Sequence, residues 1–298
     1  LIIHYLEYDH LKLLNYDLNS FSSLKISILH YFMLLALLIS IATPPFSYWL
    51  TEGYAAASPA GSVFLSTYTT KVAIFLIARM FVGNALLIYI GIGMGIYGVI
   101  CAILETDIRK IINFSIVSQL GLILLALGIG DMESKEGAAL MLTVGVVYTA
   151  LIMMCAGSVI LAVHTQQYYK IGYIVDKMTT VFIYSIIACS AISALPLTAG
   201  YLGKFYLYQS KYVIDNAWLK YCIMTISAGI TFSIGLKFPV FVFVSNLKSG
   251  RKSPILHANY QLSNYRSLAL FILGFCCIIL GLFPEALLQV NVSLANKT

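Results

Sequence analysis

The sequence predicts an all-α membrane protein: a polytopic bundle of transmembrane helices, some of them discontinuous. Of its 298 residues, 60% are hydrophobic and only 10% are charged, which is far from the composition of soluble domains. Apolar stretches long enough to cross a hydrocarbon core about 30 Å thick recur along the chain. They lack the strict apolar–polar alternation of barrel strands, and a helix satisfies all of its own backbone groups in lipid. Helices are therefore the expected spanning elements.

Eight apolar stretches are predicted to cross the membrane. They are residues 27–43, 62–82, 85–104, 110–130, 137–163, 179–195, 217–245 and 267–283. Residues 1–26 are too charged for a signal-peptide core and are predicted to lie outside the membrane. A C-terminal tail, residues 284–298, is predicted to follow the membrane domain of residues 27–283.

Two segments interrupt the apolar pattern. Residues 43–61 contain three prolines, and residues 196–212 contain Pro196, Gly200 and Gly203. Proline and glycine weaken a helix interior, so we expect residues 196–212 to form a break followed by a short helix. A lysine follows each interruption, which suggests an internal repeat of the kind that transporters build from broken helices.

Lysines in or near the spans are the strongest candidates for chemistry. Lys71 is near the centre of its span, roughly 13 Å from either interface at about 1.5 Å per residue. A charge at that depth costs about 3 kcal/mol on insertion scales, so it is expected to face a polar interior with a carboxylate or water. Its alternative role is a structural ion pair with a neighbouring helix. Lys204 follows the break at 196–203, whose freed carbonyls can solvate an ammonium.

Lys237 is nearer to the end of its span, so it is expected either to reach the interface with its long side chain or to join a polar path. The span 137–163 contains no ionisable side chain except the phenol of Tyr148. Any proton path through it would depend on Thr143, Tyr148, Thr149 and water.

Two further patterns concern packing and loops. Gly91 and Gly95 lie on one face of the span 85–104, and small residues at this spacing allow two helices to approach closely. The connection that carries Glu105, Asp107, Arg109 and Lys110 is expected to be a solvated loop.

The composition argues against several other classes. The six cysteines all fall in apolar segments, without a C-x-x-C pair or a histidine at metal-ligand spacing. No G-x-G-x-x-G follows a strand, so we expect no flavin, iron–sulfur cluster, NADH or metal in this chain. The net charge of +6 resides largely in short connections, which suits loops beside membrane lipids and not a nucleic-acid surface.

Three ordered motifs between residues 44 and 205 resemble the proton-conducting, antiporter-like membrane family. They are PPFSYWLTEGYAAASPAGSVFLSTYTTKVAIFLIARMF, ETDIRKIINFSIVSQLG and ISALPLTAGYLGKF. The family comprises subunits 2, 4 and 5 of respiratory complex I and the large subunits of multisubunit cation/proton antiporters. The first motif looks most like the D-type antiporter subunit and its complex I relatives.

The resemblance implies roles for individual residues. Lys71 stands where the family has a proton-relay lysine after P-x-x-x-W-L, and Lys204 stands at the later broken-helix lysine after L-P-x-x-x-G-x-x-x-K. The family's central segment reads H-A-x-x-H-x-x-x-K-A-L-L-F. Here Met141, Gly145 and Thr149 occupy the places of its two histidines and its lysine. The central relay is therefore expected to be degenerate.

The family also has further N-terminal helices, one of which carries a glutamate that pairs with the first lysine, and subunit 5 has a C-terminal lateral helix. This chain is expected to be a truncated or split member that lacks both. Its missing helices would then come from another chain or from neighbouring membrane-arm subunits.

The resemblance implies a membrane-arm subunit of a proton-translocating NADH:ubiquinone oxidoreductase, in the mitochondrial inner membrane or a bacterial plasma membrane. The chain would contribute to catalysis without a redox centre of its own. Two alternatives stay open: a component of a stand-alone cation/proton antiporter, and a structural scaffold. For orientation, Arg109, Lys110, Lys170, Lys177, Lys248, Arg251, Lys252 and Arg266 are predicted to share the matrix or cytoplasmic side.

Overall fold

The computed structural model describes residues 24–171, 173–244 and 263–282, and every regular element in these ranges is a helix. The all-α prediction is confirmed. The helices are α2 (Leu24–Ser40), α3 (Tyr48–Ala56), α4 (Pro59–Met80), α5 (Ala85–Leu104), α6 (Ile108–Ile129), α7 (Met132–Val163), α8 (Thr179–Ser193), α9 (Ala199–Gln209), α10 (Lys211–Asp215), α11 (Ala217–Ile230), α12 (Lys237–Pro239) and α13 (Asn264–Leu282). Short 3₁₀ turns cover Tyr168–Lys170 and Val175–Lys177. A π-helical stretch, Thr231–Leu236, joins α11 to α12, and a second one, Val240–Val244, continues α12, so that Ala217–Val244 forms one long helix.

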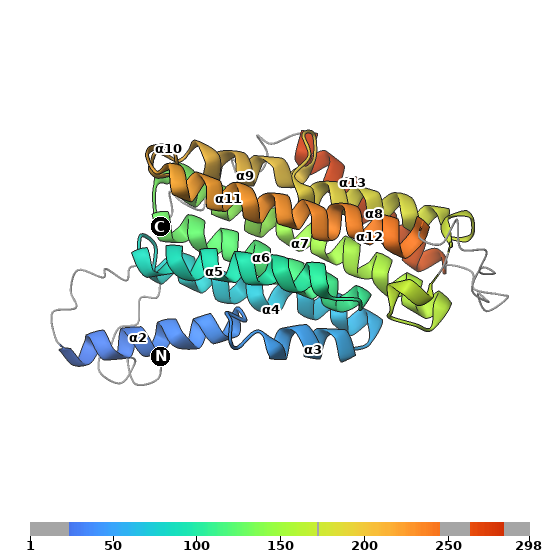
Figure 1. Cartoon of the computed structure of the whole chain (residues 1–298), viewed down its shortest axis with the longest axis horizontal. Coiled ribbons are helices and arrows are strands. Elements are labelled where there is room, and N and C mark those ends of the chain that lie inside the picture. The colour runs from blue at the N-terminus through green and yellow to red at the C-terminus, as the bar shows by residue number, and fades with distance from the viewer. Residues whose placement is uncertain (1–23, 172, 245–262, 283–298) are drawn as a thin grey trace.

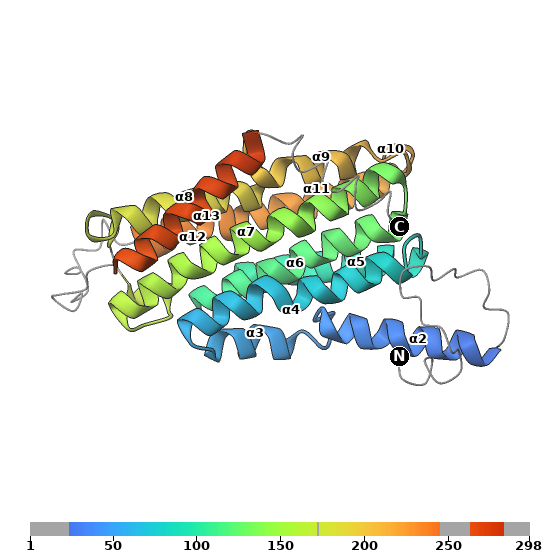
Figure 2. The same cartoon turned by 180° about the vertical axis from the view of Figure 1, so that it is seen from behind.

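Among the described residues, six helices are long and apolar enough to cross a membrane: α4, α5, α6, α7, the helix Ala217–Val244 and α13. The stretches predicted at 27–43 and 179–195 are also helical, but the helices there are shorter than these six: α2 ends at Ser40 and α8 ends at Ser193. The prediction that each of them crosses the membrane stays a prediction. In Figures 1 and 2, α3 continues the line of α2, and α9 continues the line of α8. Each pair is a discontinuous helix, and the two pairs run in opposite directions.

At the first break, between α2 and α3, nearby residues supply hydrogen-bond donors to the last carbonyls of α2. The Ile39 carbonyl accepts from the Ala42 N–H and from the Trp49 indole N–H, both at 3.0 Å. The Leu38 carbonyl accepts from the backbone N–H and the hydroxyl of Thr43. The prolines that follow carry no N–H and cannot prolong the helix. The break therefore leaves these carbonyls paired without a charged group.

Helix α6 lies at the centre of the bundle and is buried along most of its length. Glycines bring α5 against it. A Cβ added at Gly91 would lie 2.7 Å from the Gly121 carbonyl oxygen, and one added at Gly121 would lie 2.6 Å from the Gly95 nitrogen. The prediction that Gly91 and Gly95 allow close helix approach is confirmed.

Arg109, at the start of α6, is only 3% exposed, so the expectation of a solvated loop is wrong for this residue. Its guanidinium donates to the Ala55 carbonyl at 3.0 Å and to the Ala57 carbonyl at 2.6 Å. Carbonyls at a helix C-terminus lack helical partners and attract cations. Arg109 therefore fastens the end of α3 to α6, and Asn113 adds a hydrogen bond to the Thr51 carbonyl.

An Arg109→Met variant is expected to lower the free energy of unfolding by about 1–3 kcal/mol, because two buried carbonyls lose their donor. Thermal unfolding of the purified chain in detergent would measure the change. Lys110→Met is the matched control. Lys110 pairs with Glu52 at 2.5 Å in a partly exposed position, so its loss should cost about 0–1 kcal/mol. Equal effects of the two variants would contradict the role given to Arg109.

The ends of α3, α5, α7 and the helix Ala217–Val244 gather at one end of the bundle, on the right in Figure 1. The Ile108 N–H donates to the Gln166 carbonyl and the Ile174 N–H to the Phe243 carbonyl, which ties these connections together. Lys170 and Lys177 lie in the two 3₁₀ turns of these connections, and Arg109 and Lys110 lie in the first turn of α6 beside them. Lys248, Arg251 and Lys252 lie outside the described residues, as do most of the predicted 1–26 segment and the 284–298 tail.

Candidate functional site

The second break, between α8 and α9, places Lys204. Ala194 and Leu197 adopt left-handed backbone conformations, with φ of 59° and 69°, which end α8 and turn the chain before α9 begins. The predicted break with a following short helix is confirmed. A Cβ on Gly200 would lie 1.9 Å from the Ala191 carbonyl oxygen, so only glycine fits there without a shift of the backbone.

Lys204, in the second turn of α9, is 8% exposed, and its ammonium donates to the Ile192 carbonyl at 3.3 Å. That carbonyl belongs to the last turn of α8, where helical partners are missing. The freed carbonyl of the broken helix thus holds the ammonium, as the sequence led us to expect. The contact is single and long.

A small cavity adjoins Lys204. It offers about 10 Å³ to the centre of a water molecule, which is room for roughly one water. Its polar lining residues are Lys204, Gln119 and Tyr148, from α9, α6 and α7. Ile123, Met141 and Ile192 contribute to its apolar wall. A lysine, an amide and a phenol therefore line one small cavity between α6, α7 and α9.

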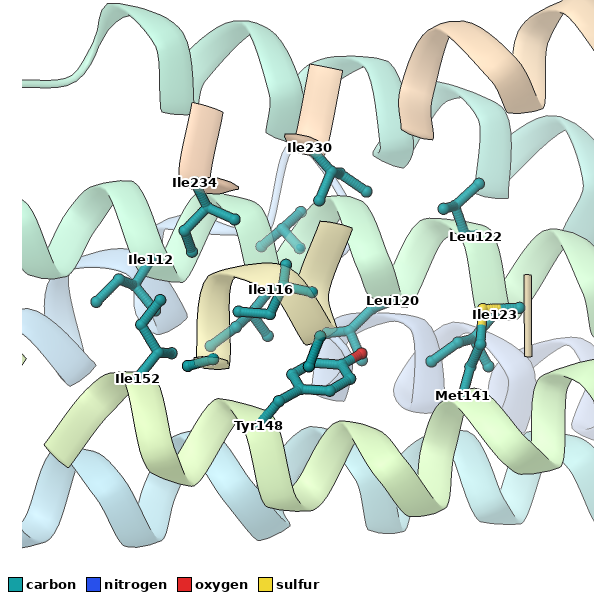
Figure 3. Close-up of a cluster of buried hydrophobic side chains, with 14 of the residues drawn as sticks. Ile112, Ile116, Leu120, Leu122, Ile123, Met141, Tyr148, Ile152, Ile230 and Ile234 are labelled. Atoms are coloured by element: carbon teal, nitrogen blue, oxygen red, sulfur yellow. The ribbon is translucent and has the colours of Figure 1, made fainter. Parts of the chain in front are cut away.

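Tyr148 joins α7 to this cavity. Figure 3 shows its ring projecting from α7 towards Leu120 of α6, with Met141 and Ile123 farther along the same two helices. The residue is 5% exposed. Of the three polar residues predicted on the span 137–163, Tyr148 is the one that lines the cavity.

The other two residues on α7 are separate from this site. The Thr149 side chain is buried and donates its hydroxyl to the Gly145 carbonyl of its own helix at 2.6 Å. Thr143 is exposed, and its hydroxyl donates to the Ala139 carbonyl. Lys237 lies elsewhere, against the end of α5. The structure therefore does not bring the predicted polar path together as one chain of groups.

Lys71 lies on the inner face of α4 and is 9% exposed. Its ammonium donates to the Ser66 carbonyl at 2.5 Å. The same face carries buried hydroxyls at Ser62, Thr67 and Thr70, and the Thr70 hydroxyl has no hydrogen-bond partner in the described structure. No carboxylate lies within ion-pair distance of Lys71 among the residues that the structure describes. Lys71 thus sits in a polar interior without an opposite charge.

Sequence reasoning missed Gln119. Its amide is nearly buried on α6, lines the Lys204 cavity and has no recorded hydrogen bond within the described ranges. A signal is present in the sequence, because an amide deep in an apolar span needs a polar neighbour. The charged residues from Glu105 to Lys110 predict a solvated connection, and this pattern gives no indication of a buried polar side chain on the helix that follows them.

The model of the family described as the transmembrane region of NADH:quinone oxidoreductase and the Mrp antiporter matches residues 5–233. The chain belongs to this family. The resemblance stated from the motifs is confirmed. In this chain Lys204 lies beside the break between α8 and α9, whereas Lys71 lies within the continuous helix α4.

Individual relatives are more distant. Hydrogenase-4 component B of Escherichia coli is 26% identical over 194 residues, which cover 58% of this chain and 29% of that protein. NADH-quinone oxidoreductase subunit L of E. coli is 29% identical over 172 residues, which cover 54% of this chain and 27% of that protein. The Mrp complex of Dietzia shares the fold, with a TM-score of 0.80 at 17% identity over 90% of this chain and 58% of that one. The chain thus spans less than a third of the two E. coli proteins.

Proposed function

We propose that this chain is a membrane-arm subunit of a proton-translocating NADH:quinone oxidoreductase. In this role Lys204 exchanges protons with water in the adjoining cavity, and the redox chemistry takes place in other subunits. The observation that carries the proposal is the buried Lys204 ammonium, held by one carbonyl of a broken helix beside a cavity with room for water. A single weak contact allows the amine to gain and lose a proton without dismantling the break.

Helix α7 separates the two candidate relay lysines. It packs against α4, which carries Lys71, and against α9, which carries Lys204. From Gly137 to Val163 its one titratable group besides Cys155 is Tyr148. A direct lysine-to-lysine relay would need a proton carrier between them, so we propose that this chain's central relay is degenerate and that Lys71 and Lys204 act separately.

Partners and location follow from the same proposal. Lys71 has no carboxylate beside it in the described bundle, and we propose that a neighbouring subunit or another segment supplies one. The surrounding membrane would be the mitochondrial inner membrane or a bacterial plasma membrane, with lipids covering the apolar outer faces. We expect no cofactor to bind this chain.

The test is the number of protons translocated per NADH oxidised in membranes that carry the assembled complex. A Lys204→Ala variant is expected to lower this ratio or stall turnover, and Lys71→Ala should do the same if it conducts independently. Lys220→Ala, an exposed position, is the control. An unchanged ratio in Lys204→Ala, with assembly intact, would overturn the proposed role of Lys204.

A scaffold is the second candidate, and the neutral core of α7 favours it. In that case both alanine variants would keep the ratio of protons to NADH, while the yield of assembled complex would fall. The family also includes Mrp antiporters, so a stand-alone cation/proton antiporter is the third. Co-purification with flavin and iron–sulfur subunits separates the oxidoreductase from the antiporter.

A further inference from the structure

Lys237 reaches from the helix Ala217–Val244 to the end of α5. It is 7% exposed, and its ammonium donates to three main-chain carbonyls: Ala102 at 3.1 Å, Ile103 at 2.7 Å and Glu105 at 2.6 Å. Its long side chain thus reaches the end of the α5 span. There the ammonium lies among three carbonyl oxygens more than 130 residues away in sequence.

These carbonyls have few other donors. Helix α5 ends at Leu104, so the carbonyls of its last turn lack the N–H groups of a following turn. The N–H groups of Thr106 and Asp107, which come next in the chain, donate to the Glu105 carboxylate at 2.9 and 3.2 Å. The negative end of the helix dipole lies at the same place and favours a cation.

The remaining side of the ammonium faces an aromatic ring. The Lys237 nitrogen lies 5.5 Å from the centre of the Tyr168 ring, within the range of a cation–π contact. The Tyr168 N–H donates to the Thr106 carbonyl, which holds the ring beside the C-terminal end of α5. π-Helical stretches on both sides of Lys237 alter the register of its helix at this point.

An ammonium has three N–H donors and no acceptor, and here three carbonyls accept from it. A proton carrier has to release a proton. The neutral amine would leave one carbonyl without a donor and would turn its lone pair towards oxygen. Lys71 and Lys204 differ, because within the described structure each ammonium donates to one carbonyl.

We propose that Lys237 is a fixed cation that closes the C-terminal end of α5 and binds it to the helix Ala217–Val244, and that it transfers no protons. The side chain acts as a tethered alkylammonium ion in a site built from three carbonyl oxygens and the face of Tyr168. The same site, emptied of its side chain, should accept a free alkylammonium ion of matching size.

The first test uses Lys237→Ala, which removes three methylenes and the ammonium. The full chain in lipid nanodiscs should lose about 5 °C or more in its unfolding temperature. n-Propylammonium, which has the missing atoms, should restore at least half of the loss, whereas sodium at the same ionic strength should not. Lys220→Ala, on the same helix but exposed, should neither lose stability nor respond to the amine.

The second test uses Lys237→Arg, because a guanidinium keeps its charge and donors but does not release a proton. The variant is expected to fold and to retain the wild-type ratio of protons to NADH in the assembled complex. Failure of Lys237→Ala to fold, beside folded Lys237→Arg and Lys220→Ala chains, also supports a structural role.

Two results would overturn the proposal. One is a Lys237→Ala chain as stable as the wild type. The other is a Lys237→Arg complex that assembles fully but no longer translocates protons. The stability measurements do not depend on which complex contains the chain, so their failure is distinct from a failure of the proposed function.

Discussion

Replacing Gly200 with alanine is expected to disrupt the break between α8 and α9, with a loss of about 3 kcal/mol or more in the free energy of unfolding. The added Cβ would meet the Ala191 carbonyl oxygen at 1.9 Å and its carbon at 3.1 Å. Both are backbone atoms and cannot swing aside as the end of a side chain can. Thermal unfolding of the purified chain is the measurement.

The same substitution should displace Lys204, because the Ile192 carbonyl that holds its ammonium is next in sequence to the carbonyl that the methyl group strikes. Proton translocation in Gly200→Ala should therefore fall together with stability. Gly93→Ala is the control. A Cβ there would meet nothing within 4 Å, and alanine in an exposed helical position should be neutral or stabilising by up to about 1 kcal/mol. A Gly200→Ala chain as stable as Gly93→Ala would show that the break tolerates a side chain.

A lysine placed at the centre of α7 is the second large effect. In Thr149→Lys the new ammonium would replace a side chain that is 1% exposed, and we expect a loss of about 3 kcal/mol. Helix α7 has no Asp or Glu after Glu136, so we expect the buried charge to find no carboxylate on its own helix.

Unfolding temperature and assembly yield would measure this effect. The matched control is Thr149→Val, which keeps the shape and removes only a hydroxyl that donates to its own helix. That change should cost less than about 1.5 kcal/mol. A Thr149→Lys chain that assembles normally and raises proton translocation would mean that a partner charge is already in place beside α7.

The fold could be predicted because its signals are local. Apolar length identifies a spanning helix, and prolines and glycines mark where one stops. These patterns led to the bundle, the break before α9 and the close contact of α5 with α6. At 27–43 and 179–195 they led to helices that are shorter than the other predicted spans and that resume as α3 and α9 after a break. The sequence shows the resumed pieces less clearly, because a short second piece has the pattern of a loop or an interruption.

The site was less predictable because it depends on contacts between distant segments. Lys204 could be proposed from the break that precedes it. Gln119 lies on a helix face that meets Lys204 only after α6, α7 and α9 pack together. Arg109 and Lys237 bind carbonyls more than 50 and 130 residues away. A charged residue beside a turn has the same local sequence pattern whether its side chain faces water or donates to the free carbonyls at the end of another helix.

The polar inner face of α4 also bears on how the protein is made. Helices of membrane proteins enter the bilayer before they pack against one another. During that interval the side chains of Ser62, Thr70 and Lys71 have no neighbouring helix, and α4 is the least apolar of the six long helices. Insertion of α4 is therefore expected to be the least favourable of the six. Helix α5 is strongly apolar and follows α4 after a short turn, so the two can insert together as a helical hairpin. Variants that shorten or polarise α5 should consequently reduce the amount of chain that reaches the membrane before they affect the stability of the finished bundle.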